Sequence, residues 1–218
     1  MSKLKDYINN LYVDLKLYNP FCQINKNTLA LDLENDINTL ISEDAKALEL
    51  VYMRALQIFN DLFDDEDDIL FVVNKYDEYE YDIIQNEDGS YDCKYLYDKP
   101  TYTQKHIRIN PYIQNKSILR KMNCICTDLG KTSEVGIKKV HNFYISCKVK
   151  DIRYKILIRE LIEDEIINNF RGMADYYIIH KEKEYVYHLC NDEWIDLSFN
   201  KNIDFEKFKE KYSKYLSE

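Results

Sequence analysis

The alternation of hydrophobic and polar residues along the chain predicts a mixture of helices and short strands. Hydrophobic residues that recur every three or four positions indicate amphipathic helices, and strict alternation indicates strands. We predict helices over residues 2–18, 42–63, 151–170 and 204–216. We predict strands over residues 27–34, 69–75, 78–85, 91–97, 104–109 and 140–149.

Capping residues and the width of the hydrophobic stripe add detail to the predicted helices. Ser42, Asp151 and Asp204 carry short polar side chains that favour the first position of a helix. The 151–170 segment is hydrophobic over more than one face, which predicts a helix buried on two sides. Residues 113–122 resemble a short helix, and residues 124–126 the start of a strand.

The stretch over residues 174–199 contains the clearest predicted β-hairpin. With a two-residue turn at Glu182 and Lys183, Tyr177 pairs with His188 across the hairpin. Because side chains alternate between the two faces of a strand, His180 and His188 are predicted to lie on opposite faces, with Cys190 on the face of His188. The two histidines therefore cannot share a metal ion.

These patterns together predict an α+β fold, with antiparallel β-hairpins and sheet packed against helices. Short turns between consecutive strands favour antiparallel pairing over a doubly wound parallel sheet. We predict one domain over residues 1–218, with two lobes whose boundary falls near residues 111–140.

Composition and charge narrow the class of partner. The net charge of -9 argues against binding to nucleic acid, which requires clustered Lys and Arg, and favours a basic protein partner. The 20 Tyr suit an interface, although AT-rich codons would enrich the same residue type. The oligomeric state is not indicated by the sequence.

The chain carries no apolar segment long enough to cross a bilayer and does not begin like a signal peptide. We therefore expect a cytoplasmic protein that does not associate with membranes. The six Cys are then expected to be reduced, and Cys124 and Cys126 are expected to be half-buried thiols in a strand.

Several familiar sites can be rejected on spacing. The acidic run over residues 64–68 has consecutive acids and no following Gly, unlike a calcium loop, and is predicted to be a solvated turn. Cys124 and Cys126 form one short pair with only His141 nearby, unlike a structural zinc site. With four Gly in the chain, nucleotide-binding loops are excluded. We predict no cofactor and no metal site.

The C-terminal half resembles an uncharacterised bacterial family, the domain of unknown function DUF3885. That family carries a segment of the type His-x-x-Asp-Asp-Arg-Gly-x-Asp before a final helix of Tyr-Glu-Lys-Tyr character. His188, Asp192 and Asp196 match this segment, whereas Glu193 and Trp194 stand where the family has Arg and Gly. Looser similarity extends over most of the chain. The resemblance implies a fold and brings no established activity.

Three functions remain open at this point. The first is a non-enzymatic cytosolic binding protein, of the immunity type, that neutralises a basic partner such as a toxin through an acidic, Tyr-rich surface. Its candidate binding residues are Trp194, Glu193, Asp192 and Tyr187. The second is a hydrolase-like enzyme in which His188 acts as general acid or base with Asp192 and Asp196. The third is a structural or scaffolding protein.

Overall fold

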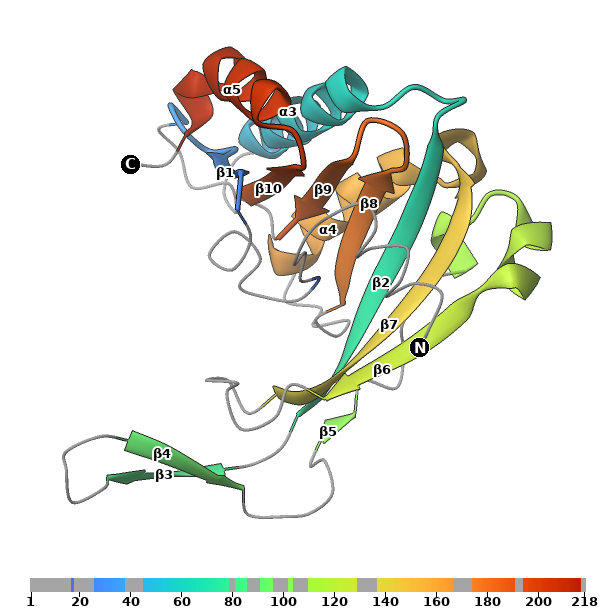
Figure 1. Ribbon diagram of the computed structural model, residues 1–218. Coiled ribbons are helices and arrows are strands. Elements are labelled where there is room, and N and C mark those ends of the chain that lie inside the picture. The colour runs from blue at the N-terminus through green and yellow to red at the C-terminus, as the bar shows by residue number, and fades with distance from the viewer. Residues whose placement is uncertain are drawn as a thin grey trace.

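In the described part of the chain, the fold consists of one large antiparallel sheet with helices packed against one of its faces (Figure 1). The computed structural model describes residues 17, 26–37, 45–78, 81–85, 91–95, 102–103, 110–128, 137–166, 174–190 and 194–216. Within these residues the predicted α+β class is confirmed. The predicted helix over residues 2–18, apart from Leu17, and the predicted strand over 104–109 lie outside the described residues.

Eight strands of the described residues form the sheet, in the order β1-β10-β9-β8-β2-β7-β6, with β5 paired to β2. They are β1 (Thr28–Asp32), β2 (Asp68–Glu78), β5 (Tyr102–Thr103), β6 (Asn123–Asp128), β7 (Ile137–Lys148), β8 (Asp175–His180), β9 (Tyr185–Leu189) and β10 (Trp194–Phe199). A separate hairpin pairs β3 (Tyr81–Gln85) with β4 (Tyr91–Tyr95), as predicted. The first predicted strand after the acidic run is longer than expected, because β2 pairs with β7 as far as Glu78.

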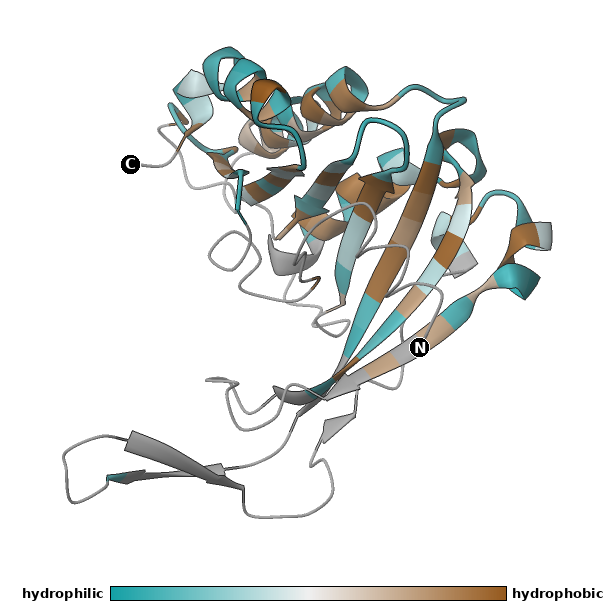
Figure 2. Cartoon of the chain, viewed as in Figure 1, coloured by the Kyte–Doolittle hydropathy of each residue, from teal (hydrophilic) through white to brown (hydrophobic). Residues whose placement is uncertain are grey.

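Three α-helices are described: α3 (Ala45–Leu62), α4 (Tyr154–Ile166) and α5 (Asn202–Lys211). Short 3-10 helices occupy Asn110–Tyr112, Lys116–Lys121, Val149–Asp151 and Ser213–Tyr215. Hydrophobic residues concentrate on the central strands and on the inner sides of the helices (Figure 2). None of the described helices combines the length and apolarity needed to cross a bilayer.

Phe59 of α3 lies at the centre of the hydrophobic core between helices and sheet. Its ring stacks on Tyr154 at 4.3 Å and on Phe63 at 4.8 Å, and meets the edge of Tyr187 at 5.3 Å. Phe59 is fully buried because α3 repeats hydrophobic residues at steps of three and four, which turns one side to the sheet. These contacts join α3, α4 and β9.

Two predicted helix starts and one predicted burial are wrong. Asp151 does not cap α4, because Ile152 is held in a β-bridge with Ile113 and the helix begins at Tyr154. Helix α5 begins at Asn202, so Asp204 lies within its first turn. The described side chains of α4 are buried on one side only, since Ile156 is 43% exposed whereas Leu157 and Ile158 are buried.

Cys124 and Cys126 were predicted to be half-buried, and this is also wrong. Both side chains are exposed because β6 is the last strand of the sheet. The thiol of Cys147, on the neighbouring strand β7, is buried, and burial raises its pKa to about 12. The acidic run forms the turn between α3 and β2, as predicted, and Glu66 pairs there with Lys148 and Lys150.

The hairpin of β8 and β9 has the predicted register, with Tyr177 opposite His188, but a longer turn. Four residues, Lys181 to Glu184, connect the strands, and Glu184 takes a positive φ of 61°. The Nδ1 atom of His180 accepts the amides of Glu182 and Lys183 at 3.2 and 3.1 Å. Its Nε2 atom lies 3.0 Å from the carboxylate of Asp67. His180 therefore holds the turn as a neutral imidazole protonated on Nε2.

We expect His180 to make stability depend on pH below about 6.5. Burial lowers the pKa of His180 in the fold, against the opposing effect of Asp67, while the unfolded chain keeps the ordinary value of about 6.5. The unfolded state then binds more protons, so the free energy of unfolding falls as pH drops from 6.5 toward the folded pKa, by at most about 1.4 kcal/mol per pH unit.

Urea denaturation of wild type and His180→Gln between pH 7.5 and 4.5 would measure this slope. The pKa of Asp67 is lowered despite its burial, through hydrogen bonds from the amide of Asp64 and from His180 and through the charge of Lys183, so its own titration falls at lower pH, below 3.8. Equal slopes for both proteins above pH 4.5 would contradict the role given to His180.

Candidate functional site

Polar side chains are buried on the face of the sheet that the described helices α3, α4 and α5 do not cover. Apart from His180, the buried polar residues of the described chain all lie there, and we call this set the polar face: Asn74, Asn142, Asp175, His188, Asp196 and Ser198. Buried polar groups cost free energy unless they are paired. Their gathering on one face makes it the candidate functional site.

The strand register places three of the reactive side chains together. His188 of β9 is directly opposite Asp196 of β10. Cys190 follows His188 by two residues, so strand alternation returns it to the same face. The amide of Cys190 donates to the carbonyl of Trp194 at 3.0 Å, which continues the pairing of the two strands beyond Leu189.

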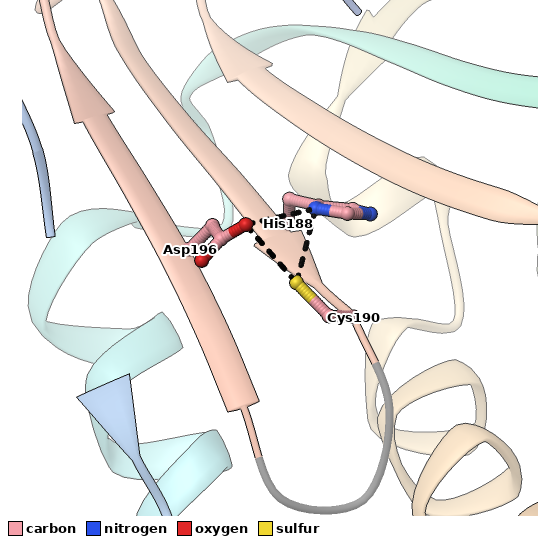
Figure 3. Close-up of side chains that lie close together, drawn as sticks. All are labelled: His188, Cys190 and Asp196. Atoms are coloured by element: carbon pink, nitrogen blue, oxygen red, sulfur yellow. Dashed lines mark hydrogen bonds and ion pairs between the residues drawn. The ribbon is translucent and has the colours of Figure 1, made fainter. Parts of the chain in front are cut away.

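The three side chains converge to a small triangle (Figure 3). The Cys190 Sγ atom lies 3.3 Å from His188 Nδ1 and 3.1 Å from Asp196 Oδ2. The His188 Nδ1 atom lies 3.7 Å from Asp196 Oδ2. His188 and Asp196 are 0% and 3% exposed, whereas Cys190 is half-buried and lies nearest to solvent.

Tyr177 and Asp175 of β8 lie on the other side of the His188 ring. Tyr177 stacks on the imidazole with ring centres 4.2 Å apart. Asp175 Oδ1 lies 4.0 Å from His188 Nε2, and the Tyr177 hydroxyl donates to Asp175 Oδ2 at 3.5 Å. The imidazole is therefore fixed in its plane, with Nδ1 facing Cys190 and Asp196 and Nε2 facing Asp175.

A thiol, an imidazole and a carboxylate in contact can transfer protons or hold a metal ion. Among the described residues, His188, Cys190 and Asp196 form the group whose ligand atoms all lie within 4.8 Å of one another. A catalytic base has to reach its substrate. The burial of His188 and Asp196 therefore leaves Cys190 as the member of the group with the best access.

The structure places the predicted site residues in different surroundings. His188 and Asp196 come together, while Asp192 and Glu193 lie outside the described residues. Trp194 is half-buried at the start of β10, opposite Asp32 of β1. Tyr187 lies in the core at 2% exposure and donates to the carbonyl of Ala55 at 3.4 Å. Its predicted place on a binding surface is wrong, because its side chain faces the helices.

Sequence reasoning did not select Cys190 as a site residue, although strand alternation placed it on the face of His188. The missing information was that residues 194–199 form a third strand, β10, rather than a segment following the hairpin. Only the pairing of β10 with β9 brings Asp196 to His188. The alternating apolar residues Ile195, Leu197 and Phe199 were a signal for that strand.

Comparison with protein families finds a family model that matches this chain. The model of the family described as Domain of unknown function (DUF3885) matches residues 4–218. The chain belongs to the DUF3885 family. The resemblance expected from the sequence is confirmed, and the DUF3885 match extends over nearly all of the chain. No curated protein and no solved structure matches this DUF3885 chain.

Proposed function

We propose that this protein is a non-enzymatic binding protein that engages a basic protein partner, in the manner of an immunity protein that neutralises a toxin. The net charge of -9 favours encounter with a partner of opposite charge. The alternative, an enzyme acting through His188 with Asp192 and Asp196, requires substrate to reach His188 and Asp196, which are buried. A structural or scaffolding role would require neither a charged partner nor access of a substrate to His188 and Asp196.

The observation that carries the proposal is an apolar strip on the outer side of α3. Leu50 and Met53 are 45% and 52% exposed. They line a groove of about 560 Å³ together with Leu56 of α3 and Tyr215 near the C-terminus. Exposed apolar residues that gather in one place are typical of protein interaction sites.

The surroundings of this groove suit an interface. Polar residues line the rest of the groove, which gives the apolar centre and polar rim common in protein complexes: Arg54, Gln57, Asn60, Asp61 and Lys214. A second groove begins at Ser213 and Leu216, next to Tyr215 in the sequence, and includes Ile203, which is 77% exposed. Helices α3 and α5 lie close together here, since Lys211 pairs with Asp61 at 2.8 Å (Figure 1).

We expect Met53→Asp to weaken partner binding by at least about tenfold, because a charge would replace an apolar contact at the centre of the interface. The tagged chain would be purified from its native cells at low salt, and the recovered partner and the neighbouring gene product would each be titrated by calorimetry. Affinity should also fall as salt rises, as expected for charge complementarity.

Ile156→Asp serves as the matched control, since Ile156 is 43% exposed and lies on α4, outside the groove of Leu50 and Met53. This variant should bind as wild type does. Recovery of no partner, including the product of the neighbouring gene, would speak against the proposal. Equal losses of affinity in Met53→Asp and Ile156→Asp would show that the groove of Leu50 and Met53 is not the binding site.

A further inference from the structure

The triangle of His188, Cys190 and Asp196 lies on the sheet face opposite the described helices and plays no part in the proposed partner binding. It combines one nitrogen, one sulfur and one oxygen ligand atom within 4.8 Å of one another. We propose that these three side chains bind a divalent transition-metal ion, with Zn²⁺ as the preferred ion. This inference does not depend on the proposed function.

The spacing of the ligand atoms fits the coordination of zinc. Bonds of about 2.0 Å to nitrogen and oxygen and about 2.3 Å to sulfur place the corners of a tetrahedron about 3.3 to 3.6 Å apart. The three edges of the triangle measure 3.1, 3.3 and 3.7 Å. One ion can therefore reach all three atoms after shifts of a few tenths of an ångström, with water at the fourth corner.

The backbone holds this arrangement. His188 and Asp196 are cross-strand partners, and directly opposite residues keep their Cβ atoms about 4.5 to 5.5 Å apart. Cys190 is two residues further along the strand from His188, on the same face. Because the register of β9 and β10 brings the three residues together, the site is built before any ion enters it.

The charges of the three side chains also fit a divalent ion. A thiolate from Cys190 and a carboxylate from Asp196 neutralise Zn²⁺, with His188 as a neutral ligand. Burial of an ionic group is tolerated when it is compensated in this way. Within the described residues, the ion pairs of Asp196 involve His188 and no Lys or Arg. A thiolate and an imidazole together favour zinc over calcium or magnesium, which prefer oxygen ligands.

Residues around the triangle support His188 as a metal ligand. Metal-binding histidines usually have a carboxylate, carbonyl or water at their second nitrogen, which fixes the tautomer and the ring. Asp175 is the carboxylate nearest to this nitrogen, with Oδ1 4.0 Å from His188 Nε2, beyond direct hydrogen-bond distance. Tyr177 both stacks on the ring and donates to Asp175. The nitrogen that faces the triangle is Nδ1, 3.3 Å from Cys190 Sγ and 3.7 Å from Asp196 Oδ2.

The competing explanation is a purely hydrogen-bonded cluster, in which the Cys190 thiol donates to Asp196. Titration of the metal-free full-length protein with Zn²⁺ and with Co²⁺ separates the two. We expect one ion per chain and, with Co²⁺, a thiolate-to-metal charge-transfer band with the intense visible bands of a tetrahedral site. Cys190→Ser should remove the charge-transfer band. His188→Gln and Asp196→Asn should each weaken Zn²⁺ binding by more than about 10- to 100-fold, the loss typical of removing a residue that only hydrogen-bonds to a metal ligand.

Cys124→Ser is the matched control, because Cys124 is exposed on β6 and should leave binding and spectrum unchanged. Alkylation of the wild-type protein needs no variant: Zn²⁺ should protect Cys190 from iodoacetamide, as seen by peptide mass spectrometry, and leave Cys124 and Cys126 reactive. Absence of stoichiometric binding to the wild type would overturn the proposal. So would a charge-transfer band that survives in Cys190→Ser, or equal alkylation of Cys190 with and without Zn²⁺.

Discussion

Phe59→Ala is expected to lower the free energy of unfolding by about 3 to 5 kcal/mol, the range found for buried Phe→Ala changes. Phe59 is fully buried and packs on Phe63, Tyr154 and Tyr187. The substitution removes apolar area and leaves a cavity that three large rings from separate elements cannot easily close. Urea denaturation followed by circular dichroism would measure the loss.

Two companion variants show whether the loss comes from packing. Phe59→Leu keeps most of the volume and should cost clearly less than Phe59→Ala. Ile203→Ala removes an apolar side chain that is 77% exposed and should change stability by no more than about 0.5 kcal/mol. A loss below about 1 kcal/mol for Phe59→Ala would mean that this aromatic cluster does not hold α3 and α4 on the sheet.

Asn74→Ala should cost about 2 to 4 kcal/mol, because it removes a fully buried amide that connects two other groups. The Asn74 Oδ1 atom accepts the side-chain amide of Asn142 at 2.5 Å. Its Nδ2 atom donates to the carbonyl of Leu17 at 2.7 Å. Alanine cannot satisfy either group, and each buried polar atom left without its partner costs about 1 to 3 kcal/mol.

A double-mutant cycle with Asn142→Ala tests the cause of this loss. The double variant lacks the Asn142 amide that Asn74→Ala leaves unpaired, so its cost should be less than the sum of the two single costs. Asn200→Ala, which removes an exposed bond to Glu184, should stay within about 1 kcal/mol of wild type. Strict additivity of Asn74→Ala and Asn142→Ala would contradict the proposed coupling. Unfolding in urea again supplies the measurement.

Local periodicity predicted those features of this fold that depend on neighbouring residues. Strand alternation placed His180 and His188 on opposite faces and Cys190 beside His188, because side chains alternate with a period of two in any strand. The hairpin register followed from counting outward from the turn, and it held although the turn has four residues. The four-residue turn has the same centre as the predicted two-residue turn, so the pairing of the strands is unchanged.

Features that depend on distant residues could not be predicted in the same way. The start of α4 is set by the bridge of Ile152 to Ile113, and nothing local marks that contact. The site was found only in part, because the meeting of His188 with Asp196 requires β10 to pair with β9. Tyr187 was assigned to a surface by residue type, whereas helix α3 covers it. Tertiary contacts decided each of these cases.

The position of β1 at the edge of the sheet has a consequence for how the protein is made. Strand β1 comes from the N-terminal part of the chain and pairs along its whole length with β10, near the C-terminus. During synthesis, β1 leaves the ribosome long before its partner exists. The pairing of β1 therefore waits until β10 has been synthesised, and chains that stop before β10 would present unpaired strand edges to chaperones and proteases.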